Sequence, residues 1–248
     1  MQNYNPIQDG IKKTTIGVTY NETKPPDDLS ELVHCYWELK SEKHLSEDFC
    51  LHVLPDACVN ILLNVCDVNI AAVTARETTY VELNLGKNFH YIGIQFLPGI
   101  WKGKRDEIAF GFVDSPYQGD LPLVETAKQL LALGFQRGQE VLTDLVQKLR
   151  ERKLVETNLV TGRILADLDV IDTVEDMAAS ANLSPRQLQR TLKKTTGFSP
   201  HDFLKVLRLQ QSFRVHYLES YVDQSHFIHS FRRITGYTPA EYFKSFHV

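Results

Sequence analysis

One stretch decides the fold of the second half of the chain, and it runs Leu183-Ser-Pro-Arg-Gln-Leu-Gln-Arg-Thr-Leu-Lys-Lys-Thr-Thr-Gly-Phe-Ser-Pro200. Ser184 followed by Pro185 predicts the start of a helix, because a serine side chain caps free backbone N–H groups and proline fits the first helical position. Gly197 predicts its end, because glycine adopts the left-handed backbone that commonly closes a helix. Ser199-Pro200 repeats the opening pair and predicts a longer helix directly afterwards.

A shorter helix precedes this stretch. Thr173, with Asp176 three residues later, has the pattern of a capping box and predicts a helix over 174–181. Asn182 lies at the turn between the two helices, where asparagine tolerates a left-handed backbone. Leu188 falls on the inner side of the second helix, from which it can pack on the first. Two short helices joined by a tight turn have the dimensions of a helix-turn-helix.

The outward face of the second helix is polar and basic, and it consists of Arg186, Gln189, Arg190, Lys193 and Lys194. In the major groove, arginine can pair with guanine and glutamine with adenine through two hydrogen bonds each, whereas lysine suits phosphates. The alternative is a helical hairpin with a solvated basic face. No acidic residue occurs from Leu183 to His201, which favours DNA binding over that alternative.

These residues resemble the first helix-turn-helix of the AraC/XylS transcriptional regulators, whose motif positions fall on Ser184, Leu188, Arg190, Gly197 and Pro200. A second segment, Asp223-Gln-Ser-His-Phe-Ile-His-Ser-Phe-Arg-Arg-Ile-Thr-Gly-Tyr-Thr-Pro-Ala-Glu-Tyr-Phe243, is similar to the second recognition helix and closing motif of that family. The resemblance spans residues 157–248. Two ordered motifs at nearly the family's spacing make chance a poor explanation.

The resemblance implies a role for individual positions. In the first unit it assigns base contacts to Arg186, Gln189 and Arg190. In the second unit, Phe227 and Phe231 are expected in the core, at the inward i and i+4 positions. The exposed positions of the second unit, where DNA contacts are expected, are Gln224, Ser225, His226, His229, Arg232 and Arg233. His226 and His229 lack an acidic or cysteine partner nearby, so no metal site is predicted there.

One feature departs from the family pattern. The family carries a short positioning helix before its second recognition helix, but here residues 211–222 run almost directly into Asp223. About ten residues are missing relative to the family pattern, which predicts a shortened second unit. Since the positioning helix normally supports the recognition helix, entry of the second unit into DNA is less strongly predicted than entry of the first.

The net charge of −4 is an average over unlike segments. Residues 1–154 carry 16 basic and 21 acidic residues, and residues 155–183 carry one arginine and six acidic residues. Residues 184–248 carry ten basic and four acidic residues, a net charge of +6, together with five of the nine histidines. A basic face on an otherwise acidic protein is typical of a protein that binds nucleic acid.

The first half of the chain reads as strands followed by helices. Alternating or short apolar runs separated by turn residues predict strands over 49–55, 59–65, 69–74, 79–85 and 90–96. Apolar residues at helical spacing predict amphipathic helices over 124–133 and 139–154. The predicted fold class is therefore α+β, with an N-terminal antiparallel β-barrel and covering helices in residues 1–154 and an all-α helix-turn-helix domain in residues 155–248.

The N-terminal half also resembles, more faintly, the cupin-like sensor domains attached to such regulators, through Tyr36-Trp37, Leu54-Pro-Asp56 and residues 93–99. This resemblance implies ligand sensing or dimerisation. His34, His52 and His90 show no close H-x-H spacing, so metal chemistry is not expected. The two tryptophans, Trp37 and Trp101, are predicted core residues. The four cysteines contain no C-x-x-C pair and are predicted to be small buried hydrophobes.

Together these features predict a sequence-specific transcription regulator that binds double-stranded DNA, is not an enzyme and has no cofactor. A small-molecule effector and a homodimer are the predicted means of control, and RNA polymerase is a partner implied by the family. Helices 124–154 are a candidate dimer surface, although they equally suit covering the barrel. The polar N-terminus and the lack of a long apolar stretch predict a soluble, cytoplasmic chain with no membrane partner.

Two alternatives stay open from the sequence. The first is a cupin-type metalloenzyme or small-molecule-binding protein with an attached helical module. The second is a regulator whose shortened second unit has lost autonomous DNA binding and acts through a partner protein.

Overall fold

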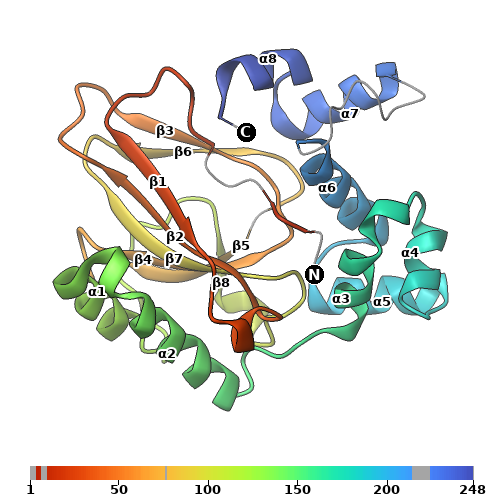
Figure 1. Ribbon diagram of the computed structural model, residues 1–248, viewed down its shortest axis with the longest axis horizontal. Coiled ribbons are helices and arrows are strands. Elements are labelled where there is room, and N and C mark those ends of the chain that lie inside the picture. Colours follow the sequence, from red (N-terminus) through yellow and green to blue (C-terminus); the bar gives the residue numbers. More distant parts are fainter. Residues whose placement is uncertain (1–3, 7–9, 76, 214–223, 248) are drawn as a thin grey trace.

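The structure is a computed structural model that describes residues 4–6, 10–75, 77–213 and 224–247. Strands and two helices form its first half, and helices alone form its second half (Figure 1). The strands are β1 (Val18–Thr23), β2 (Val33–Ser41), β3 (Phe49–Val53), β4 (Val59–Asn64), β5 (Ala71–Ala75), β6 (Val81–Gly86), β7 (His90–Phe96) and β8 (Ile108–Phe110). All five predicted strands are present, and β1, β2 and β8 are additional.

Six strands form one sheet in the order β1-β2-β7-β4-β5-β8, in which every pair is antiparallel except β5 with β8. Side chains alternate across this sheet, as the period of a strand requires. Neighbouring residues on β2 therefore face opposite sides: Tyr36 contributes to one core cluster and Trp37 to another.

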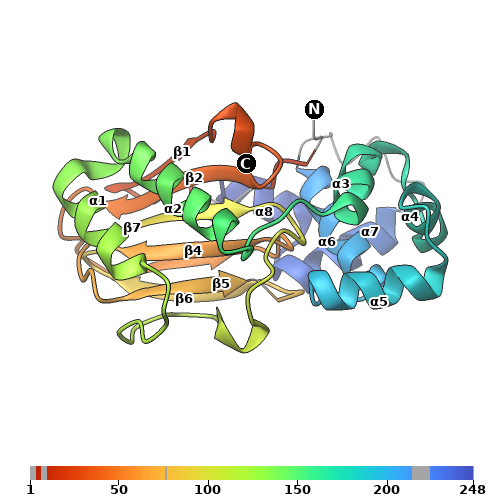
Figure 2. The same ribbon diagram turned by 90° about the horizontal axis from the view of Figure 1, so that it is seen from below.

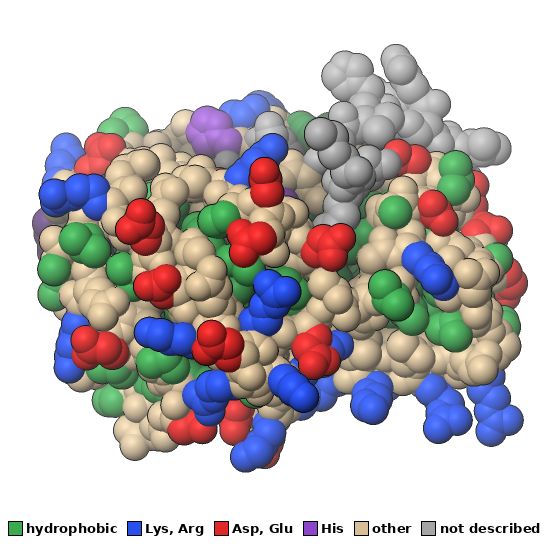
Figure 3. All heavy atoms as spheres, turned by 60° about the horizontal axis from the view of Figure 1, so that its bottom comes forward, with side chains coloured by type: hydrophobic (Ala, Val, Ile, Leu, Met, Phe, Trp, Pro, Cys, Tyr) green, Lys and Arg blue, Asp and Glu red, His purple; other side chains and the backbone are tan. Residues whose placement is uncertain are grey.

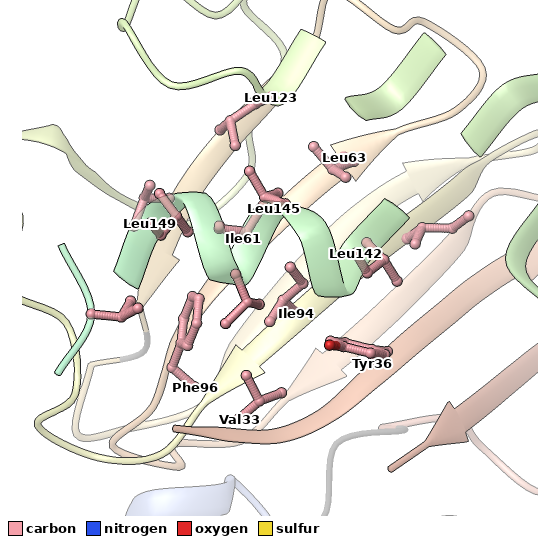
Figure 4. Close-up of a cluster of buried hydrophobic side chains, with 14 of the residues drawn as sticks. Val33, Tyr36, Ile61, Leu63, Ile94, Phe96, Leu123, Leu142, Leu145 and Leu149 are labelled. Atoms are coloured by element: carbon pink, nitrogen blue, oxygen red, sulfur yellow. The ribbon is translucent and has the colours of Figure 1, made fainter. Parts of the chain in front are cut away.

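Two helices cover one face of the six-stranded sheet: α1 (Leu123–Arg137) and α2 (Gln139–Glu151). Figure 4 shows Leu142, Leu145 and Leu149 of α2 above Ile94 and Phe96, and all five side chains are buried. The Leu/Val stripe of α2 is thus used within its own chain. A dimer contact would have to use other residues.

A two-stranded sheet, β3 with β6, covers the opposite face of the six-stranded sheet. Between these two sheets lies a core that includes Trp37, Leu51 and Phe89. The predicted β-rich half is confirmed, but its predicted barrel is not found: in the part of the chain that the structure describes, β1 and β8 remain the separate edges of an open sheet. The barrel was predicted from a series of short strands, and this pattern suits a two-layer sandwich equally well.

The helical half contains α3 (Leu159–Ala166), α4 (Val174–Ser180), α5 (Pro185–Thr195), α6 (Pro200–Ser212), α7 (Gln224–Thr235) and α8 (Pro239–Ser245). Short 3-10 turns lie at η1 (Asp27–Leu29), η2 (Arg105–Glu107) and η3 (Leu168–Val170). The predicted helix starts at Thr173, Ser184 and Ser199 are confirmed, each by a side-chain cap. Asn158 and Thr238 cap α3 and α8 in the same way. None of the helices in the described ranges combines the length and apolar character that a membrane crossing requires.

The two halves share their apolar cores. Tyr4, Ala57 and Cys58 are buried in the same cluster as the inner side chains of α3 to α6. Leu54 is buried with side chains of α6, α7 and α8. The helical half is therefore built against the sheet rather than attached to it by a bare linker.

The predicted core residues hold for the tryptophans and for half of the cysteines. Trp37 and Trp101 are buried, as are Cys35 and Cys58. Cys50 and Cys66 are exposed, so their predicted burial is wrong. Cys50 lies on the outer side of the two-stranded sheet β3–β6. Cys66 follows the end of β4, where the alternation of a strand no longer holds a side chain inward.

Candidate nucleic-acid interface

Two capping boxes set the start of α4 and α5. At α4, the Asp176 backbone N–H donates to the Thr173 hydroxyl at 3.0 Å, and the Thr173 N–H donates to the Asp176 carboxylate at 2.8 Å. Hydrogen bonds from the Thr173 hydroxyl and from backbone N–H groups lower the pKa of Asp176 below its ordinary value. At α5, Ser184 and Gln187 make the same reciprocal pair, at 3.3 and 2.9 Å. Both helices therefore begin at positions that the sequence specifies.

Apolar packing fixes the angle between α4 and α5. Leu188 and Leu192 of α5 are fully buried beside Met177 and Ala178 of α4. Asn182 adopts φ of 54° in the turn, as the sequence predicts. Since the inner side of α5 is held by this core, the opposite side has a defined orientation toward solvent.

The five predicted contact residues of α5, Arg186, Gln189, Arg190, Lys193 and Lys194, are all exposed. No salt bridge to a carboxylate occurs at the four cations among them within the described residues. The Lys193 ammonium donates to the Gly197 carbonyl at 3.0 Å, which leaves it two further N–H donors. Figure 3 shows Lys and Arg side chains projecting along the lower edge of the molecule, where Figure 2 places α5.

The second predicted unit consists of α7 and α8. Phe227 and Phe231 are buried, as predicted, in a cluster with Ile234 and Tyr242. Four predicted contact residues of α7 are exposed: Ser225, His229, Arg232 and Arg233. Gln224 and His226 lie in α7, but their side chains are not among those that the structure describes. The shortened connection falls almost entirely on residues 214–223, which also lie outside the described ranges.

The sheet half touches the C-terminal end of both helices. At Gly197, beyond α5, a Cβ atom would lie 2.8 Å from a guanidinium nitrogen of Arg105. At Gly236, beyond α7, a Cβ atom would lie 2.8 Å from the ring of Tyr80. Both glycines adopt positive φ, +86° and +80°. Neither Arg105 nor Tyr80 is singled out by the sequence, since nothing in their own segments distinguishes them from ordinary loop residues.

A buried junction accompanies these contacts. The Gln210 side chain of α6 donates to the Pro55 carbonyl at 2.7 Å, and the Tyr80 backbone N–H donates to the Ile234 carbonyl at 2.8 Å. The His52 ring lies 4.8 Å from Tyr80 and 4.9 Å from Phe246, measured between ring centroids. Burial lowers the pKa of His52, so its imidazole is neutral at pH 7.

The three histidines considered for metal chemistry lie in different surroundings. His34 pairs with Asn5 at 2.8 Å, His90 pairs with the Glu38 carboxylate at 2.9 Å, and His52 lies in the aromatic junction. Among the described residues, no three His, Cys, Asp or Glu side chains gather in a way that could hold a metal ion.

Comparison with known proteins gives the family of the helical half. Residues 172–205, which contain α4 and α5, match the bacterial regulatory helix-turn-helix proteins of the AraC family. These residues therefore form a helix-turn-helix of the AraC type. The resemblance stated from the sequence is confirmed, and the chain is accordingly a DNA-binding transcription regulator with a helix-turn-helix.

The remaining comparisons add less. Residues 21–104 match a domain of unknown function, DUF6597. No curated protein matches the sequence. A crystal structure of an apo ToxT variant from Vibrio cholerae is similar, with 11% sequence identity, a TM-score of 0.42, and coverage of 91% of this chain and 95% of that one.

Proposed function

We propose that the chain regulates transcription by reading a specific DNA sequence with α5, under the control of its sheet half. The observation that carries the proposal is the two-sided character of α5. Its inner leucines are fully buried, and its outer face presents long polar side chains that pair with no carboxylate among the described residues. Such a helix suits the major groove, which admits one α-helix.

The roles within α5 follow from side-chain chemistry. Arg186, Gln189 and Arg190 are proposed to contact base edges, because their planar groups can form paired hydrogen bonds with guanine or adenine. Lys193 and Lys194 are proposed to contact phosphates. Each good bidentate pair contributes about 1–3 kcal/mol of discrimination against the wrong base.

The second unit is proposed to assist at a neighbouring position on the DNA. Its proposed contact residues are Gln224, Ser225, His226, His229, Arg232 and Arg233. The exposure of Arg232 and Arg233 supports this proposal, since both project from a helix whose phenylalanines are buried. We therefore favour direct DNA binding by the full chain over action through a partner protein.

Control by the sheet half is supported by the contacts at Gly197 and Gly236. Arg105 lies against the end of α5 and Tyr80 against the end of α7. A small displacement of the sheet half would therefore change the position of both helices. A ligand or a second copy that favours one arrangement would shift the population of DNA-competent molecules. An apolar pocket between the sheets, lined in part by Tyr20, Trp37 and Phe112, is the proposed effector site.

The test is selection of bound duplexes from a random double-stranded DNA pool by the full chain. The expected result is enrichment of one sequence, and two half-sites about 34 Å apart if a homodimer binds. A variant with alanine at Arg186, Gln189 and Arg190 should enrich nothing. Equal retention of random duplexes by both proteins would contradict the proposal. Recruitment of RNA polymerase is a separate step, testable by transcription in vitro from the enriched sequence.

A further inference from the structure

A loop of the sheet half, Lys102–Arg105, lies against the end of the proposed recognition helix. The contact is direct: the Arg105 guanidinium occupies the space beside Gly197, so that a Cβ atom added at this glycine would lie only 2.8 Å from a guanidinium nitrogen. Lys102, Lys104 and Arg105 are all exposed. The loop therefore presents its charges beside α5 while belonging to the other half of the chain.

Charge gathers at this contact. Burial lowers the pKa of Lys102, Glu156 partly offsets this, and the Lys194 ammonium lowers that pKa further, so the charge of Lys102 is felt together with that of α5. Lys104 is paired with Glu107 at 3.4 Å. Arg105 makes no salt bridge within the described residues. Figure 3 shows Lys and Arg side chains along the lower edge of both halves, with Asp and Glu side chains among them on the sheet half.

The position of the Lys102–Arg105 loop suits the DNA backbone rather than the bases. A recognition helix contacts base edges from within the groove, and residues beside it contact the phosphates that border the groove. Arg105 lies against Gly197, beyond the C-terminal end of α5. Lys102 precedes it in the same loop and interacts electrostatically with Lys194 in the last turn of α5. Cations placed there would meet the phosphate backbone if α5 entered the groove.

We propose that Lys102 and Arg105 bind DNA phosphates, so that the sheet half forms part of the DNA interface. This inference rests on the proposed function, since it needs α5 to be in the groove. It differs from a purely structural role, in which Arg105 would only neutralise the carbonyl end of α5. In the structural role the arginine matters for stability, and in the phosphate role it matters for the dependence of binding on salt.

The experiment measures DNA affinity of the full chain against salt concentration, using a selected duplex and a random one. Each phosphate contact makes the slope of log affinity against log salt more negative by about 0.9, because the contact releases a condensed counterion. Arg105→Gln is expected to make the negative slope shallower by about 0.9, and the double variant Lys102→Gln, Arg105→Gln by about 1.8. The loss should be equal on both duplexes, since phosphates carry no sequence information.

Two matched variants complete the test. Arg105→Lys keeps the charge and should keep most of the slope. Lys128→Gln removes an exposed charge from α1, which lies at the opposite end of the molecule from α5 in Figure 2, and should leave the slope unchanged. Thermal unfolding of each variant detects any loss of folding.

The outcomes separate this inference from the proposed function. A reduced slope for Arg105→Gln with Lys128→Gln unchanged supports the phosphate role. An unchanged slope, with or without a lower melting temperature, overturns it while leaving binding by α5 intact. A wild-type chain that binds no duplex overturns both.

Discussion

Leu54→Ala tests whether the second helical unit is held in place by the sheet half. Leu54 is 6% exposed and lies in the same apolar cluster as Leu209 of α6, Phe231 of α7 and Tyr242 of α8. It is contributed by the segment after β3, whereas most of the cluster comes from the C-terminal helices. Removing its side chain leaves a cavity at the junction between the halves.

The expected cost is about 2–5 kcal/mol in the free energy of unfolding, the range for deleting a buried leucine side chain. The matched control is Leu131→Ala on α1, because Leu131 is 58% exposed. A substitution at an exposed site, outside the core and away from helix caps, changes the free energy of unfolding by about 0.5 kcal/mol or less. The same chemical change at the two sites thus isolates the effect of burial at the junction.

The assay combines urea unfolding with amide hydrogen exchange. Leu54→Ala should lower the unfolding free energy and accelerate exchange in residues 224–246 more than in α2, while Leu131→Ala should do neither. If the two variants were equally stable, or if exchange in α7 and α8 stayed at the wild-type rate, the shared core would not hold the second unit.

Three further predictions concern caps and titrating groups. Ser184→Ala removes the side-chain cap of α5 and should cost about 0.5–2 kcal/mol in urea unfolding, and no change would mean that the cap is dispensable. Burial lowers the pKa of His52, although Glu82 partly opposes this, so the stability contributed by neutral His52 is present above pH 6.5 and lost below it. His52→Phe should therefore flatten the fall in unfolding free energy between pH 7 and 5. A fall identical to that of the wild type would refute this. Burial raises the pKa of Glu38, but hydrogen bonds from His90, Asn21 and Lys40 outweigh burial and set the pKa at about 2. The contribution of ionised Glu38 to stability is therefore present above pH 4.5 and lost toward pH 2. Glu38→Gln should reduce this loss of unfolding free energy in acid, and an unaltered acid titration would contradict the prediction.

The local structure of the helical half was predictable because each start depends on short-range chemistry. Ser184 with Pro185 and Thr173 with Asp176 need only their own neighbours to form a cap, and the structure has both. Exposure of the outer face of α5 was predictable for the same reason, since Leu188 and Leu192 specify the buried side.

Long-range features were not predictable from pattern. A series of alternating strands does not say whether a sheet closes, and here β5 pairs in parallel with the short β8 while the edges stay apart. The contacts of Arg105 and Tyr80 with Gly197 and Gly236 join segments about ninety and more than 150 residues apart, so no local signal marks them. Cys50 and Cys66 show that residue type alone does not settle burial.

The central claim is that α5 reads bases, and the comparison of Arg190→Ala with Lys194→Ala tests it most directly. Both side chains are exposed and neither makes a salt bridge within the described residues, so neither change should unfold the protein. Affinity is measured for a selected duplex and for single-base-pair variants of it at fixed salt. Arg190→Ala should abolish discrimination at one base pair, a loss of about 1–3 kcal/mol, whereas Lys194→Ala should weaken every duplex alike. Equal weakening of all duplexes by both variants would contradict base reading by α5.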